Sequence, residues 1–296
     1  MKLTAPKYYH NFKCIADKCS HSCCIGWEID VDEVTIEKYT SLSGDYADII
    51  RSSIEGGDTP HFLLCGGERC PHLTKTGLCR IITEYGDGYL CDICREHPRF
   101  YNNTLHGLEA GLGMACEEAC RIILSSDDYD KMTVIEEDFE SDEKFENFDI
   151  IPHRTYIYEI LKSDNTHYTD KIARTEEIFN ISLTTLSDEE WRNILSSLEY
   201  LDQEHRELFS CYSSSVEASC EKILERALAY FIYRHVSSAW DEESLRARVG
   251  FSLFCERLLA SIISHADIDP VTAARIISEE IEYSEENTQI IIDVFI

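Results

Sequence analysis

The cysteines of this 296-residue chain are concentrated toward its start, and that distribution restricts the fold more than any other feature. Eleven of the fourteen lie at or before Cys120. Most of the glycines and prolines lie in the same segment, which predicts short elements joined by many turns. A segment rich in thiols and in turns is typical of a fold organised around a bound metal.

Four thiols lie within eleven residues in "CIADKCSHSCCIGWEID", at Cys14, Cys19, Cys23 and Cys24. A chain of this length has enough apolar material to fold around a core without disulfide cross-links. No apolar run of the kind found in a secretory leader follows Lys2. We therefore predict a cytoplasmic protein whose thiols stay reduced, so that clustered cysteines serve metal binding or catalysis.

Two further cysteine pairs have the spacing of metal ligands. Cys91 and Cys94 form a C-x2-C pair, in which two thiolates reach one metal from a tight turn. Cys70 and Cys79 flank a predicted turn at Gly77 in "RCPHLTKTGLC". Zinc and a cubane iron–sulfur cluster each need four ligands, and the chain has more cysteines than either requires. The spacing therefore predicts a metal site and leaves both metals open.

Motifs that would identify other chemistry are absent from the sequence. It contains no Walker loop, no G-x-S-x-G and no H-E-x-x-H. The C-x3-C-x2-C signature of radical S-adenosylmethionine enzymes is not completed, because Cys24 follows Cys23 directly. His21, His72 and His97 lie near the cysteines, but hydrogen bonding within loops explains each of them equally well.

The chain is strongly acidic, with a formal net charge of −29. Such a surface repels nucleic acid and anionic lipid and favours cationic partners, so we predict no binding to nucleic acid. No stretch of about 18 apolar residues occurs, so we predict no transmembrane segment. The sequence supports no prediction of the oligomeric state.

The composition changes between residues 125 and 149, where eleven acidic residues accompany two lysines. A charge run of this kind is typical of a solvated linker or an exposed helix. We predict a cysteine-rich metal domain over 1–124, an acidic linker over 125–149 and an α-helical domain over 150–296. The predicted fold class is mainly α: a loop-rich, cysteine- and metal-organised N-terminal domain followed by an α-helical domain.

Local patterns predict individual helices in the second half. Ser187 and Glu190 have the spacing of a capping box, and Asp269 and Pro270 that of an N-cap and first helical residue. Apolar residues recur at helical spacing in "CEKILERALAYFIYRHV", namely Leu224, Leu228, Phe231 and Ile232. The later cysteines are predicted to be small buried side chains within such helices: Cys211, Cys220 and Cys255.

Four motifs together resemble the flagellin lysine-N-methylase family: "APKYYHNFKCIADKCSHSCCIGWEIDVDE", "RCPHLTKTGLC", "LCDICREHPRFYN" and "GLGMACEEACRIIL". The first two-fifths of the chain also resembles bacterial cysteine-cluster proteins described as zinc- or iron-chelating. The family resemblance implies methyl transfer from S-adenosylmethionine to surface lysines of flagellin, and a 4Fe-4S cluster. Because family members tend to be longer, it also predicts a C-terminal truncation of this chain.

The resemblance implies that the cluster ligands lie among the motif cysteines, of which one cubane takes four. These are Cys14, Cys19, Cys23, Cys24, Cys70, Cys79, Cys91 and Cys94, with Cys116 as an outlier. We predict that the ligands include at least one of the cysteines at 19, 23 and 24, and at least one of those at 91 and 94. The choice between Cys23 and Cys24 stays open.

No catalytic or S-adenosylmethionine-binding residue can be assigned from the sequence. A lysine amine must lose its proton before it can attack a methyl group, so direct displacement calls for a base or a desolvated pocket. Radical chemistry at the cluster is the open alternative. Side chains able to act as a base are Glu109, Glu117, Glu118, Tyr85 and Tyr101, but a structural or solvated role explains each of them better. The rival to an enzyme is a non-catalytic zinc- or iron-binding module for protein interaction.

Overall fold

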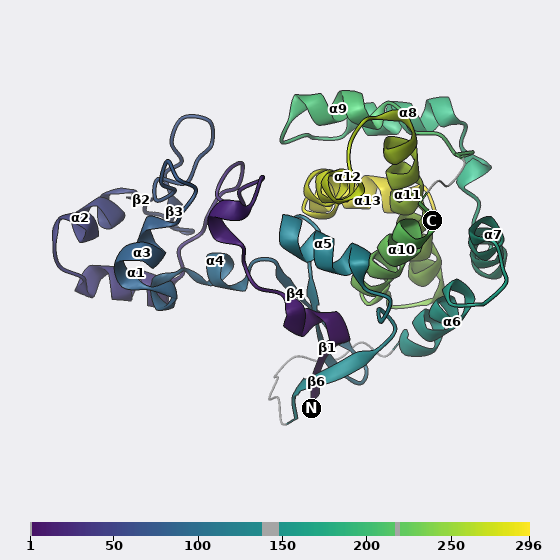
Figure 1. Cartoon of the computed structure of the whole chain (residues 1–296), viewed down its shortest axis with the longest axis horizontal. Coiled ribbons are helices and arrows are strands. Elements are labelled where there is room, and N and C mark those ends of the chain that lie inside the picture. The colour runs from purple at the N-terminus through teal and green to yellow at the C-terminus, as the bar shows by residue number, and fades with distance from the viewer. Residues whose placement is uncertain (1, 138–147, 217–219) are drawn as a thin grey trace. The chain divides into compact units, whose positions relative to one another are not determined.

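The computed structural model describes residues 2–137, 148–216 and 220–296. The chain divides into two compact units (Figure 1). Lys13–Pro98 form one, which we call the cysteine unit, and Met1–Phe12 with Arg99–Ile296 form the other, the helical unit. These boundaries differ from the predicted limits at 124 and 149, because residues 1–12 and 99–124 belong with the later part of the chain. Within the predicted acidic linker, residues 138–147 lie outside the described residues.

The cysteine unit is built from short elements. They are α1 (Glu33–Ser41), α2 (Asp45–Ser52), β2 (Ile54–Glu55), β3 (His61–Phe62), α3 (Arg80–Tyr85) and α4 (Asp92–Glu96). Asp32 begins α1 as an N-cap, because its Oδ1 accepts the Thr35 amide at 2.9 Å. A small core lies between these elements, with Tyr39, Ile50 and Phe62 almost fully buried.

The helical unit contains a four-stranded sheet in the order β4-β5-β1-β6. Its strands are β1 (Lys2–Pro6), β4 (Arg99–Thr104), β5 (Gly107–Leu112) and β6 (Met132–Glu136). β1 pairs parallel to β5 and antiparallel to β6. Glycine is required at Gly107, where a Cβ atom would stand 2.5 Å from the Lys2 carbonyl oxygen. This close approach brings the first strand of the chain into the helical unit.

Helices make up the rest of this unit. They are α5 (Glu117–Ser125), α6 (Ile151–Leu161), α7 (Tyr168–Phe179), α8 (Asp188–Ser197), α9 (Gln203–Phe209), α10 (Glu221–Val236), α11 (Glu242–His265), α12 (Pro270–Ile277) and α13 (Glu285–Asp293). α10 packs against α11, α5 and α6, while α12 packs against α11 and α5. Trp191 lies 4.5 Å from Phe254 between ring centroids, in one large apolar core. The predicted fold class is confirmed.

The local helix predictions are confirmed. Ser187 and Glu190 form the predicted capping box at α8. Asp269 caps α12, with Pro270 at its first position. The apolar residues predicted to form one face of α10 are all buried: Leu224, Leu228, Phe231 and Ile232. The prediction for the later cysteines is correct for Cys255, which is buried in α11.

The prediction that the later cysteines are buried within helices is wrong for Cys211 and Cys220. Cys211 lies two residues beyond the end of α9, and Cys220 is the N-cap residue of α10. Both are only half-buried. In the part of the chain that the structure describes, no helix is both long and apolar enough to cross a membrane.

We expect Ser187→Ala to lower the free energy of unfolding by about 1 kcal/mol, the usual cost of losing a side-chain N-cap. Urea denaturation followed by circular dichroism measures this loss. Ser196→Ala is the matched control in the same helix, because the Ser196 hydroxyl only donates to the Asn193 carbonyl at 2.8 Å. Equal stabilities for the two variants would contradict the capping role.

Candidate metal centre

The C-x2-C pair is positioned by the short helix α4. Cys91 is the residue before the helix and Cys94 lies in its first turn. Residues three apart on a helix share a face, so both thiols point to the same side. A hydrogen bond joins the two side chains. The two thiols of the C-x2-C pair are thus neighbours in the structure, and their binding of one metal stays a prediction.

Cys70 and Cys79 are brought together by the turn between them. Leu73 and Cys79 form an antiparallel bridge, and Gly77 adopts the positive φ of 79° that the turn needs. Cys79 is the N-cap residue of α3. The predicted turn at Gly77 therefore places the two cysteines of "RCPHLTKTGLC" on neighbouring chain segments.

The adjacent Cys23 and Cys24 have different environments. The Cys24 carbonyl oxygen accepts the Cys70 amide at 2.8 Å, which holds this segment against the Cys70 segment. The Cys24 side chain packs against the core of the cysteine unit, whereas Cys23 is exposed. The pairing of the two backbones thus directs Cys24 inward.

Five of the eight predicted metal ligands meet in one small core. Cys70 and Cys91 are buried there, with exposed fractions of 7% and 1%. The three half-buried thiols that pack against this core are Cys24, Cys79 and Cys94. The remaining predicted ligands lie outside it: Cys14 and Cys23 are exposed, and the half-buried Cys19 donates its thiol to the His21 carbonyl at 2.6 Å. Cys116 belongs to the helical unit.

The surroundings of the five thiols shift their pKa values in different directions. Burial raises the pKa of Cys70 to about 12 and also raises the pKa of Cys79. The hydrogen bond between Cys91 and Cys94 lowers the pKa of Cys91 and raises that of Cys94. A hydrogen bond with Cys23 lowers the pKa of Cys24 to about 7. A bound cation would favour the thiolate form of every one of them.

The donor set fits a metal that prefers sulfur ligands, such as zinc or the irons of an iron–sulfur cluster. His72 is not available, because its Nδ1 meets the Tyr46 hydroxyl at 3.1 Å and its Nε2 the Ser53 hydroxyl at 3.0 Å. Within the described ranges, no three His, Cys, Asp or Glu side chains are placed to hold a metal ion together. The backbone gathers the thiols, and their side chains must turn toward one another to share a metal.

The candidate bases have other roles in the structure. Both Glu109 oxygens accept the Arg154 guanidinium at 2.6 Å, in a buried ion pair of the helical unit. Glu118 pairs with Arg121. Tyr85 stacks on Tyr46, with 5.8 Å between ring centroids. Tyr101 is exposed on β4 and Glu117 lies in the first turn of α5. None of these arrangements identifies a catalytic base.

Two hollows in the cysteine unit were not predicted from the sequence. One is apolar, with a volume of about 220 Å³, and the other is acidic, with a volume of about 420 Å³. The acidic residues in "EIDVDE" and "GGDTP" are the feature of the sequence that could have indicated the acidic hollow. Their meeting in space depends on the bridge between Asp30 and His61 and on the Val31 amide, which donates to the Pro60 carbonyl at 2.7 Å, and the local sequence pattern reveals neither contact.

Comparison with curated proteins identifies relatives from Salmonella. Over 135 residues the chain is 27% identical to the flagellar biosynthetic protein FliU of Salmonella muenchen, covering 43% of this chain and 79% of that protein. Over 149 residues it is 26% identical to the lysine-N-methylases of Salmonella choleraesuis and Salmonella typhimurium. The chain is distantly similar to lysine-N-methylase. This confirms the resemblance inferred from the cysteine motifs.

The lysine-N-methylase alignments cover 46% of this chain and 37% of each relative. The chain therefore matches little more than a third of the length of those enzymes. No protein-family model matches the chain. No solved structure matches it either.

Proposed function

We propose that this chain is an S-adenosylmethionine-dependent protein-lysine N-methyltransferase acting on flagellin, with a 4Fe-4S cluster in its cysteine unit. One observation carries the proposal: a chain similar to lysine-N-methylases gathers five thiols in a single core. The names of these relatives supply lysine methylation and a flagellar context. The thiols supply the metal site.

The ligands would be four of the five gathered cysteines: Cys24, Cys70, Cys79, Cys91 and Cys94. This set meets both conditions inferred from the sequence, since it includes Cys24 and the C-x2-C pair. A bound cluster would supply electron transfer or an iron site for a ligand. Cys65 lies in the same unit but is exposed, so it serves as an internal comparison.

The amine of the substrate sets a further requirement. A lysine has a pKa of about 10.4, so near neutral pH about one amine in 2,500 is uncharged. Removing the proton costs about 4.6 kcal/mol at pH 7. Nearby carboxylates attract the ammonium but raise its pKa, so they favour binding over activation. Acidic residues of this chain would therefore hold the lysine, and loss of its proton needs a different group or a desolvated position.

The proposal is tested with protein purified without oxygen. We expect about four irons and four sulfides per chain, and transfer of label from methyl-labelled S-adenosylmethionine to unmodified flagellin. Peptide mass spectrometry should place the label on lysine. Cys65→Ser is the matched control and should retain both properties, whereas Cys91→Ser should lose them. Absence of label transfer by cluster-loaded protein would contradict the enzymatic activity.

A non-catalytic metal-binding module is the second candidate. It is favoured by the packing of the five thiols into the core of their own unit, as in structural zinc sites. This candidate predicts a colourless protein with one zinc per chain after anaerobic purification. It also predicts that flagellin acquires no label. Iron and sulfide in the purified protein would exclude the zinc form of this candidate, and label transfer to flagellin would exclude the non-catalytic module as a whole.

A further inference from the structure

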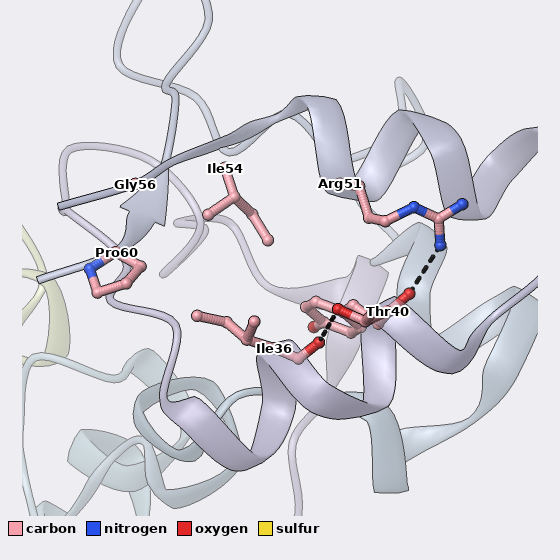
Figure 2. A pocket seen from close by; sticks show the side chains of 7 residues that line it. Ile36, Thr40, Arg51, Ile54, Gly56 and Pro60 are labelled. Atoms are coloured by element: carbon pink, nitrogen blue, oxygen red, sulfur yellow. Dashed lines mark hydrogen bonds between the residues drawn. The ribbon is translucent and has the colours of Figure 1, made fainter.

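The apolar hollow of the cysteine unit lies between α1 and β2. Figure 2 shows Ile36 from α1 and Ile54 from β2 pointing toward one another, with Pro60 at one end and Arg51 at the other. The Arg51 Nη1 donates to the Tyr39 carbonyl at 2.8 Å and to the Leu42 carbonyl at 3.0 Å. Because this guanidinium caps the end of α1, the hollow itself presents mainly aliphatic surface.

The acidic hollow adjoins the apolar one, since Pro60 lines both. Five carboxylates line it and no Lys or Arg does: Asp30, Asp32, Glu33, Asp58 and Asp92. Asp32 is engaged, because it accepts the Thr35 and Asp92 amides, each at 2.9 Å. Asp92 forms an ion pair with Arg95. Asp30, Glu33 and Asp58 are exposed and supply the negative charge available to a ligand.

An exposed apolar side chain also lines the acidic hollow, since Ile93 is 49% exposed there. Together with the apolar hollow it forms a surface with aliphatic and negatively charged parts side by side. A partner that matches this surface carries apolar side chains next to a cation.

The two hollows border the core that holds the thiols. Asp92 and Ile93, in the acidic hollow, lie between Cys91 and Cys94 in the chain. Tyr39 lines the apolar hollow and belongs to the thiol-containing core. Its hydroxyl donates to the Tyr89 carbonyl at 2.7 Å, and this hydrogen bond holds the Tyr39 side chain in the wall of the apolar hollow.

We propose that the two hollows form one docking groove for an extended, basic segment of a protein partner. An apolar side chain of the segment enters the hollow between Ile36 and Ile54, and a neighbouring lysine ammonium enters the acidic hollow. Charge complementarity and the adjoining apolar hollow determine this choice of occupant. That the segment belongs to a methylation substrate rests on the proposed function. The groove itself, and the kind of peptide that fits it, do not depend on the proposed function.

Gly56 gives a direct test of the apolar hollow, which it lines. A Cβ atom there would meet nothing within 4 Å, and its backbone is not in the left-handed region. The backbone should therefore tolerate Gly56→Phe without strain, and the variant places an aromatic ring at the wall of the hollow. Gly66 is equally open and lies outside the groove, so Gly66→Phe is the matched control.

The probe is a fluorescein-labelled peptide of alternating leucine and lysine residues, titrated with metal-loaded protein and followed by fluorescence anisotropy. We expect Gly56→Phe to weaken binding by about tenfold or more, because one aliphatic side chain loses its buried site. Gly66→Phe should bind as the unaltered protein does. A companion peptide with serine in place of leucine should bind weakly to all three proteins. Equal affinity of the first peptide for both variants would overturn the apolar half of the groove.

The acidic half is tested by neutralising its available carboxylates together. Asp30→Asn, Glu33→Gln and Asp58→Asn should weaken binding by about tenfold at low salt, from three exposed charge interactions. This difference should shrink near 0.5 M salt, where charges are screened within about 4 Å. The control makes the same charge change at exposed positions outside the groove, with Asp17→Asn, Glu68→Gln and Asp87→Asn. Equal losses in both triple variants would overturn a specific acidic site.

These binding results are distinguishable from the proposed activity. Groove-dependent peptide binding without methyl transfer to flagellin would support the groove and contradict the proposed function. Methyl transfer with unchanged peptide binding in Gly56→Phe and the groove triple variant would support the function and overturn the groove.

Discussion

Replacing Cys91 by serine should abolish metal binding by the cysteine unit. Five thiols meet in the core of this unit, and a zinc ion or a cubane cluster takes four of them. Losing one thiol of the C-x2-C pair leaves the site without the two ligands that α4 places together. Serine has the same shape but does not supply a thiolate, so the loss reflects chemistry and not packing.

The same reasoning applies to all five cysteines gathered in this core. With five thiols for four positions, we expect at most one of five single Cys→Ser variants to retain the full metal content. The variants replace Cys24, Cys70, Cys79, Cys91 and Cys94 in turn. Iron, zinc and acid-labile sulfide per chain, together with the visible absorbance, measure the result. Retention of metal by two or more of these variants would contradict a site built from this core.

The sharpest comparison is between two neighbouring residues. Cys24 packs against the core and Cys23 is exposed, so Cys24→Ser should reduce metal binding and Cys23→Ser should not. Cys65→Ser provides a second control from the same unit. If Cys23→Ser loses the metal and Cys24→Ser keeps it, the segment around these residues must rearrange on metal binding.

The features that the sequence predicts correctly are local ones. The capping box of Ser187 and Glu190 and the start of α12 at Asp269 each depend on atoms within three residues of one another. The buried face of α10 follows from helical periodicity alone. Such signals act within one element, so they do not require knowledge of how the chain returns on itself.

The unpredicted features all depend on distant pairings. β1 joins the helical unit because Leu3 pairs with Leu108, and the acidic run gives no sign of that contact. The inward position of Cys24 and the exposure of Cys23 accompany the hydrogen bond between the Cys24 and Cys70 backbones, and which of the two binds the metal stays a prediction. The kind of metal stays a prediction, because zinc and iron–sulfur centres accept the same thiolates.

We expect Glu256→Gln to stabilise the protein above neutral pH. Glu256 lies fully buried in α11, and the Tyr168 hydroxyl and Arg257 are its polar neighbours. The Arg257 Nε stands 3.9 Å from Oε2, and no described group makes a hydrogen bond of good geometry to either oxygen. Burial raises the pKa of Glu256 to about 7, from an ordinary value of 4.5.

The direction of the effect follows from proton binding. The folded protein holds this proton more tightly than the unfolded chain does, so its contribution to stability is complete below about pH 4.5. That contribution is lost as the pH rises through about 7. The loss amounts to about 3 kcal/mol, taking about 1.4 kcal/mol for each unit of pKa. A glutamine has the shape of the protonated acid and does not ionise, so the variant avoids the loss.

Urea denaturation of both proteins at several pH values from about 5 to about 8 measures the difference in unfolding free energy. Other titrating groups are common to the two proteins and largely cancel. Glu282→Gln is the control, for which the opposite effect is expected. Burial alone would raise the pKa of Glu282. The charge of Arg234 and a hydrogen bond from His235 outweigh burial, so that pKa is lowered. This control should be destabilised at pH 8. A difference for Glu256→Gln that does not change with pH would show that Glu256 does not titrate in this range.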